Sequence, residues 1–178
     1  ADQNNQMLIK APTELSTIIE LAIEKVKIEE SQRVDILIND TGEIYADRDA
    51  IEKMLAIFIE NGLKYSGDNG IVRIYSRREK SFMKVSVEDN GIGIAKEHHE
   101  KVFERFYRVD TSRTKSVEGV TSAGLGLSIA KWIADQHDIK IDLESEIDEG
   151  TRIILTIPIV TDKFMSDNDL VTDDEVVE

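Results

Sequence analysis

The 178-residue sequence contains no cysteine, which excludes disulfides, thiol nucleophiles and cysteine-ligated metal sites. It also has no apolar run close to the roughly 20 residues that a membrane-spanning helix needs, and no signal peptide opens it. No internal repeat is visible. We therefore expect one domain in a reducing, cytoplasmic compartment, with no direct membrane contact by this stretch of chain.

Positive charge is scarce. Lysine and arginine number 22 against 36 aspartates and glutamates, so the net charge is −14. No basic stripe with interleaved aromatic residues is present. A surface of this sign repels a nucleic-acid backbone, so we expect no nucleic-acid partner.

The ends of the sequence differ from its middle. Residues 1–11 are mostly polar and begin without methionine, which indicates a linker within a longer protein. Residues 161–178 hold seven acids and one lysine, so we expect a disordered tail. The folded domain is expected over residues 12–160.

Hydrophobic periodicity predicts helices over about 13–31, 49–64 and 124–137, the first with Thr17 and Glu20 at capping-box spacing. Short strands are expected at 34–38 and 44–46, around a turn at 40–42. Alternating patterns predict a hairpin from 71–77 and 83–87 and closing strands at 139–143 and 151–157. This mixed order predicts an α/β two-layer sandwich with helices on one face of the sheet.

Asn61, Lys64 and Tyr65 fall at positions i, i+3 and i+4, on one face near the end of the second helix. An amide oxygen is a ligand that suits Mg²⁺, and an ammonium group suits phosphate. The alternative is an ordinary helix end with a surface lysine.

Two glycine-containing segments follow. Asp89 to Ile94 comes directly after a strand, and an aspartate there can accept a hydrogen bond from an exocyclic amine. Its alternative is a simple glycine-rich turn. Gly124 to Leu127 opens a helix, where free backbone amides and the helix dipole favour an anion. It is not a dinucleotide fingerprint.

In this order, the three segments resemble the N, G1 and G2 boxes of the catalytic ATP-binding domain of sensor histidine kinases. That domain belongs to an ATPase group shared with gyrase, the Hsp90 chaperones and the MutL repair proteins. Phe103 to Arg108 matches the F box, and a further glycine motif lies near Gly150 and Thr151. The resemblance spans Pro12 to Pro158 and implies the Bergerat ATP-binding fold, a mixed and mainly antiparallel sheet.

The resemblance also implies roles. ATP and Mg²⁺ are the implied ligands, with Asn61 on the metal and Asp89 on the adenine amine. Phe103 and Phe106 would anchor a lid formed by residues 108–123. Lys64 and Arg108 would touch phosphate oxygens and, with Asn61, are the implied catalytic residues. The other implied ligand-binding residues are Tyr65 and Ile94 near the nucleotide, Gly91 and Gly93 against the base, Thr151 reaching adenine, and the amides of Gly124, Leu125, Gly126 and Leu127.

Such kinases transfer the γ-phosphoryl group to a histidine on a helical hairpin, and from there to a response regulator. The histidines of this chain, His98, His99 and His137, lack the context of a phosphoacceptor, so we expect surface or capping roles. Residues 1–11 would then be the remnant of the linker to the hairpin.

One departure from the family pattern bears on catalysis. The kinases usually carry a second asparagine four residues before Asn61, and the related ATPases a glutamate, but here Ile57 cannot accept a proton. A nucleotide-binding regulatory module with reduced or lost transfer therefore stays open. So does a serine kinase of the anti-sigma type, although the F box and the long lid favour a histidine kinase.

Overall fold

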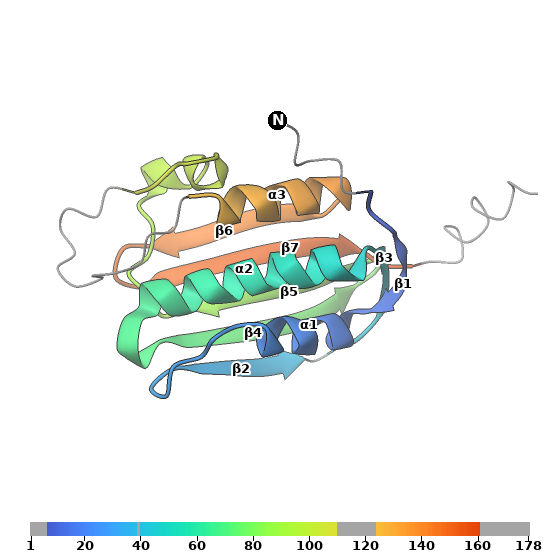
Figure 1. Cartoon of the computed structure of the whole chain (residues 1–178), viewed down its shortest axis with the longest axis horizontal. Helices are drawn as coiled ribbons and strands as arrows, with labels where there is room; N and C mark the ends of the chain where they lie inside the picture. The colour runs from blue at the N-terminus through green and yellow to red at the C-terminus, as the bar shows by residue number, and fades with distance from the viewer. Residues whose placement is uncertain (1–6, 39, 110–123, 161–178) are drawn as a thin grey trace, which may run out of the picture.

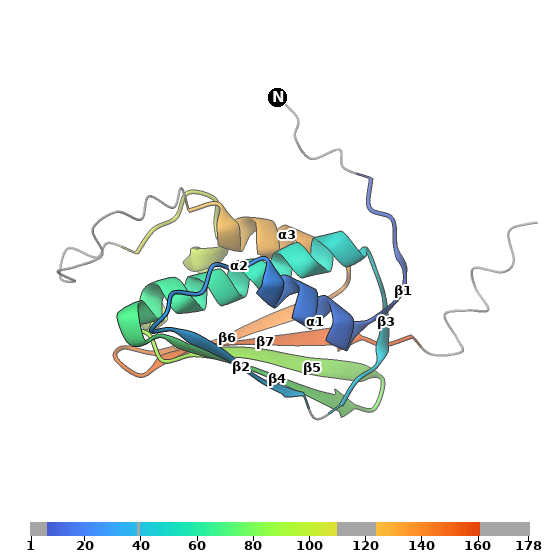
Figure 2. The same cartoon turned by 60° about the horizontal axis from the view of Figure 1, so that its bottom comes forward.

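The computed structural model of the chain describes residues 7–38, 40–109 and 124–160. Figure 1 shows a broad sheet with the helices lying side by side across one of its faces. After the 60° turn in Figure 2, the helices form a layer separate from the sheet. The predicted α/β two-layer sandwich is confirmed.

The main sheet has five strands in the order β2 (Arg33–Ile38), β4 (Ile71–Glu79), β5 (Phe82–Asp89), β7 (Gly150–Pro158) and β6 (Lys140–Glu146). The β2–β4 pair is parallel and the other three pairs are antiparallel. The sheet is therefore mixed and mainly antiparallel, as expected. Register places Asp89 opposite Thr151, so two predicted site residues meet across β5 and β7.

The helices are α1 (Leu15–Glu24), α2 (Arg48–Ser66) and α3 (Gly126–Gln136), and short 3₁₀ turns lie at Gly67–Asn69, Lys96–His98 and Lys101–Phe103. Their inner faces share one core with the covered face of the sheet. The 19-residue α2 lies between α1 and α3 (Figure 1), and its buried residues include Ile51, Leu55 and Ile59. No helix among the described residues is long and apolar enough to cross a membrane.

The predicted first helix was too long. Residues 11–14 form β1 (Ala11–Glu14), which pairs antiparallel with β3 (Glu43–Ala46) in a separate two-stranded sheet. The helix then begins at Leu15, whose amide donates to the carbonyl of Gly42 at 3.0 Å. Its N-cap residue, Glu14, makes no capping bond, so the capping box expected at Thr17 was wrong.

The two strands predicted around residues 40–42 exist but do not pair with each other. β2 adds to the edge of the main sheet, whereas β3 pairs with β1. The hairpin of β4 and β5, and that of β6 and β7, are confirmed. Most of the predicted lid, residues 110–123, and the predicted tail, residues 161–178, lie outside the described residues.

Candidate functional site

The C-terminal half of α2 lies tightly against the end of β5. A Cβ atom on Gly62 would come within 2.8 Å of Val72 Cγ2 and 3.2 Å of Asp89 Cβ, so only glycine lets the helix approach this closely. The neighbouring Asn61 is half-buried, and its side chain makes no hydrogen bond to another described residue. This close packing at Gly62 was not predicted from the sequence.

Asp89 is the polar centre of the site. Its Oδ1 atom accepts hydrogen bonds from the amides of Gly91 at 2.8 Å and Thr151 at 3.3 Å. Burial raises the pKa of Asp89 to about 6, although these two hydrogen bonds act in the opposite direction. Within the described residues, Oδ2 accepts no hydrogen bond, so it is available to a ligand donor.

The glycines after Asp89 are required by the protein's own packing. A Cβ atom on Gly91 would lie 2.8 Å from the carbonyl oxygen of Tyr65. Gly93 has φ of +71°, and a Cβ there would lie 1.8 Å from the carbonyl oxygen of Glu146. The expectation that these glycines admit the base therefore stays a prediction, because intramolecular contacts already explain both of them.

Ser145 was also missed. Its hydroxyl accepts from the amide of Ile94 at 2.7 Å, donates to the carbonyl of Gly150 at 2.8 Å, and lies 2.8 Å from Thr151 Oγ1. It thus ties the Asp89–Ile94 loop to the β6–β7 hairpin. No sequence signal was available, because Ser145 lies beyond the predicted strand 139–143 and its pairing with Thr151 appears only in the structure.

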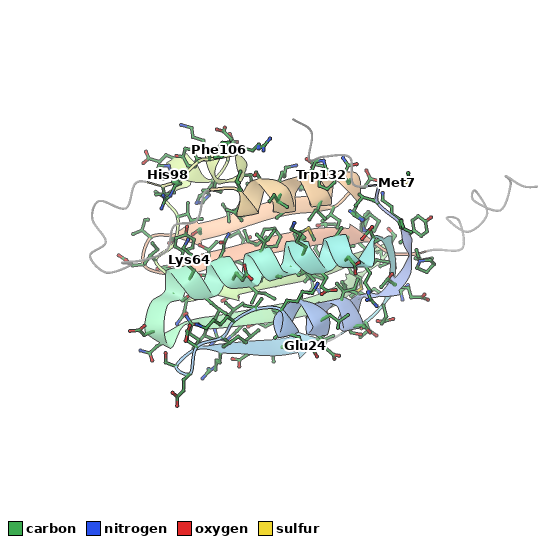
Figure 3. All side chains as sticks on the ribbon, in the orientation of Figure 1. Met7, Glu24, Lys64, His98, Phe106 and Trp132 are labelled. Carbon is green, nitrogen blue, oxygen red and sulfur yellow. The ribbon has the colours of Figure 1, made fainter. Side chains whose placement is uncertain are left out.

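Lys64 and Arg108 bring positive charge to the same end of α2. Burial lowers the pKa of Lys64, and the positive charge of Arg108 lowers it further. Two cations that destabilise each other are a suitable environment for an anion. Lys64 also lies 5.2 Å from the ring centre of Tyr65, which is 42% exposed. In Figure 3, Lys64 and His98 lie towards the same end of the molecule.

The Gly124–Leu127 segment leads into α3. Gly124 has φ of +68°, and its carbonyl accepts from the amide of Phe106 at 3.0 Å. α3 begins at Gly126 with no side-chain cap and no acid in its first turn, which leaves its amino end suited to an anion. A Cβ on Gly126 would lie 3.4 Å from Ile57 Cγ2, so α3 begins beside the N-box helix.

The two phenylalanines of the F box differ in burial. Phe103 packs against the core, whereas Phe106 is 66% exposed with φ of +64°. Figure 3 shows Phe106 at the edge of the molecule. The predicted role of Phe103 and Phe106, which is to anchor the lid by packing, stays a prediction because most of the lid lies outside the described residues.

All three histidine side chains make hydrogen bonds within the fold. His98 Nδ1 is hydrogen-bonded to the Tyr107 hydroxyl, and His99 Nε2 lies 2.8 Å from the carbonyl of Ile94. Both are half-buried. His137 is the C-cap residue of α3, as a capping role predicted, but it is buried rather than on the surface.

A cavity of about 700 Å³ opens at the Ile94 loop and the β6–β7 hairpin. Its lining includes Ile94 and Ser145 but not Asn61, Lys64 or Asp89, so it adjoins the site built around Asp89 and does not contain that carboxylate. Its lining residues are Ile94, Ala95, Lys96, His99, Glu144, Ser145, Glu146 and Ile147.

The side chains present fit the implied ligands. Among the described residues, no group of three or more histidines, aspartates or glutamates could hold a metal ion. A single amide such as Asn61 fits Mg²⁺, which keeps several waters and takes its other ligands from phosphate oxygens. A buried carboxylate with one unoccupied oxygen fits the amine of adenine.

Comparison with known proteins gives consistent results. Residues 46–161 match the family model described as histidine kinase-, DNA gyrase B- and HSP90-like ATPase. Sensor histidine kinase WalK of Bacillus subtilis (strain 168) is 39% identical over 143 residues, which are 78% of this chain and 23% of WalK. This chain thus spans about a quarter of that relative.

Solved structures agree on the fold. The nucleotide-free catalytic domain of histidine kinase ThkA has a TM-score of 0.67 at 29% identity, covering 84% of this chain and 96% of that chain. ThkA in complex with response regulator protein TrrA has a TM-score of 0.66 at 28% identity, covering 85% and 42%. The family model, these relatives and the site geometry lead to one assignment: the chain belongs to the histidine kinase-, DNA gyrase B- and HSP90-like ATPase family.

Proposed function

We propose that this chain is the catalytic domain of a sensor histidine kinase, which binds Mg-ATP and transfers the γ-phosphoryl group to a histidine on a separate helical hairpin. The observation that carries the proposal is the buried Asp89 carboxylate, with Oδ1 held by two amides and Oδ2 available, packed against the half of α2 that carries Lys64. Similarity to WalK and ThkA supports the kinase over other members of the family.

Each side chain has a role in this proposal. Asp89 Oδ2 accepts from the adenine amine, while Tyr65 borders the nucleotide. Lys64 and Arg108 bind the phosphate oxygens, together with the first amides of α3. Asn61 holds Mg²⁺, which neutralises charge on the phosphates when bound. Phosphoryl transfer depends mostly on such positioning and electrostatic stabilisation.

The partners are also part of the proposal. The phosphoacceptor hairpin would belong to the same longer protein, and a response regulator would receive the group next. ThkA has been solved in complex with response regulator TrrA, which supports a partner of this type. We propose a cytoplasmic location for the domain, because similarity to sensor histidine kinases also supports this.

Calorimetric titration with Mg-ATP tests the binding step. The unmodified chain should bind Mg-ATP, and Asn61→Ala should remove the dependence on Mg²⁺ while leaving the circular dichroism spectrum unchanged. Asp89→Asn should weaken ATP binding by about 1–3 kcal/mol, the cost of spoiling one buried polar pairing. Affinity that neither substitution alters would refute the assignment of the site.

A second candidate, a nucleotide-binding module with little transfer activity, is favoured by the position of Ile57 beside Gly126 at the start of α3. Incubation with labelled ATP and a purified acceptor hairpin separates the two. Labelled phosphohistidine supports the kinase, whereas tight binding without transfer supports the module. An acid-stable label would indicate a serine kinase instead, because phosphohistidine is acid-labile.

A further inference from the structure

Ser145 occupies the junction of three segments that are distant in sequence. Its single hydroxyl is within 2.8 Å of the Ile94 amide, the Gly150 carbonyl and the Thr151 hydroxyl. A serine hydroxyl has one hydrogen to donate and two lone pairs to accept with. Three partners therefore use its full capacity.

The donor and acceptor roles of these groups follow from their chemistry. The Ile94 amide can only donate and the Gly150 carbonyl can only accept. The hydrogen of Ser145 is thus directed to Gly150, so the hydroxyl of Thr151 must donate to Ser145. Thr151 Oγ1 is left with lone pairs only for any other neighbour.

The same threonine is joined to Asp89. Its amide donates to Asp89 Oδ1, and the two residues are opposite each other in the β5–β7 pair. Both groups that Asp89 and Thr151 can offer to a base, the carboxylate oxygen and the threonine oxygen, are then acceptors. The amine of a 6-amino purine has two hydrogens, one for each acceptor. A 6-oxo purine offers only the single hydrogen on its ring nitrogen, and its carbonyl meets lone pairs.

We propose that Ser145 is a specificity-determining residue, which selects a 6-amino purine over a 6-oxo purine by fixing the Thr151 hydroxyl as an acceptor. This inference rests on the proposed nucleotide site. Without Ser145, the Thr151 hydroxyl can rotate and donate its hydrogen to a carbonyl oxygen. Discrimination between the two purines then weakens, even where overall affinity also falls.

Binding of ATP and of ITP tests this, because the two differ at the 6-position and in the proton on the adjacent ring nitrogen. The unmodified chain should prefer ATP, and Ser145→Ala should lower the ratio of ATP to ITP affinity by about tenfold. Ser76→Ala is a matched control, since its hydroxyl donates to the carbonyl of Asp40 in another part of the structure, and it should leave the ratio unchanged.

A double-mutant cycle shows whether Ser145 orients the Thr151 hydroxyl or only stabilises the fold. In a Thr151→Val background, which has no hydroxyl to orient, Ser145→Ala should not change the ratio further. A ratio that Ser145→Ala leaves unaltered, or changes equally in both backgrounds, overturns the inference. Failure of the unmodified chain to bind ATP would instead refute the proposed function. If Ser145→Ala does not fold, Thr151→Val alone should still lower the ratio, and an unchanged ratio there overturns the inference.

Discussion

At the scale of single residues, the Asp89 carboxyl is buried, yet the proposed site requires it to be ionised. Burial raises its pKa to about 6 from an ordinary value of 3.8. A raised pKa means that this residue favours folding most below pH 3.8, and that this contribution is lost as the pH rises through about 6. The ionised form that an amine requires is therefore maintained at a cost in stability.

Nucleotide affinity should consequently depend on the protonation of Asp89. Between pH 7.5 and 5, ATP affinity should fall by up to about tenfold per pH unit below about pH 6, because the protonated carboxyl is a weaker acceptor. The phosphates of ATP also titrate in this range, so the measured quantity is the ratio of affinities between the unmodified chain and Asp89→Asn. A ratio that is constant with pH would contradict the role of Asp89.

Ile57 allows a second prediction at this scale. It lies one helical turn before Asn61 and against the start of α3, where an asparagine is smaller and can orient the attacking group. Ile57→Asn should raise the rate of transfer to an acceptor hairpin by about tenfold or more, with little change in the KM for ATP. Ile57→Val is the control, and equal rates for both variants would exclude a catalytic function at this position.

Asp89 and Thr151 entered the candidate site in different ways, and their ligand-binding roles stay predictions. An acid at a strand end close to glycines is recognisable in the sequence, whereas Thr151 was implied by the family resemblance. Gly62 and Ser145 were missed, since their importance depends on contacts with Val72 and Ile94 that sequence spacing does not reveal.

At the scale of elements, Asp47 and His137 join the N-terminal segment to α2 and α3. Asp47 is the N-cap residue of α2, and its two carboxylate oxygens accept from the amides of Ala50 and Ile9. Its own amide donates to His137 Nε2 at 3.0 Å, while His137 Nδ1 donates to the carbonyl of Ile133 at 2.7 Å. This arrangement requires a neutral imidazole, since Nε2 acts as an acceptor.

The ionisation of His137 should therefore affect stability. Burial, with the positive charge of Lys10, lowers the His137 pKa below 6.5, although the Ile133 carbonyl, Asp47 and Asp138 act against this. A lowered pKa stabilises the fold above about pH 6.5, and that contribution is lost as the pH falls. Burial would raise the pKa of Asp47, but hydrogen bonds from Ala50 and Ile9 and the charge of His137 hold it below its ordinary value, so Asp47 stays ionised in this range.

Urea unfolding of the unmodified chain and of His137→Gln tests this. At pH 7.5, the free energy of unfolding of the variant should be about 1 kcal/mol lower, provided that glutamine does not restore the hydrogen bond from Asp47. This difference between the two proteins should shrink towards pH 5.5. Because Asp89 changes stability in the opposite sense over this range, the comparison is between variants at each pH. His99→Gln serves as the control, and a His137→Gln difference that is constant with pH would refute the prediction.

The sequence predicted the hairpins correctly but not the pairing of strands that are distant in sequence. Alternating patterns located both hairpins because each of them joins strands adjacent in sequence. The pairing of β2 with β4, and of β1 with β3, depends on contacts between distant segments that periodicity does not contain. The first helix was extended to residue 31 because its apolar stripe continues through Val26, which is buried after the helix has ended.

At the scale of the whole molecule, the fold was predicted because motif order constrains it more than composition does. The net charge of −14 conflicts with a site for a polyanion. Seven of the acids fall in residues 161–178, whereas Lys64 and Arg108 lie close enough to affect each other at the C-terminal end of α2. Since the Debye length is about 10 Å at 0.1 M salt, near charges should outweigh distant ones.

This balance can be measured by varying ionic strength. If Lys64 and Arg108 dominate, ATP affinity should fall by about three- to tenfold between 50 and 500 mM NaCl at constant free Mg²⁺, because salt weakens attraction to the phosphates. Lys64→Met should lower both the affinity and its dependence on salt, whereas Lys84→Met, on β5 away from α2, should change neither. If the net charge of −14 dominated instead, added salt would screen repulsion and affinity would rise, and that sign would show that the field of the whole molecule governs access to the site.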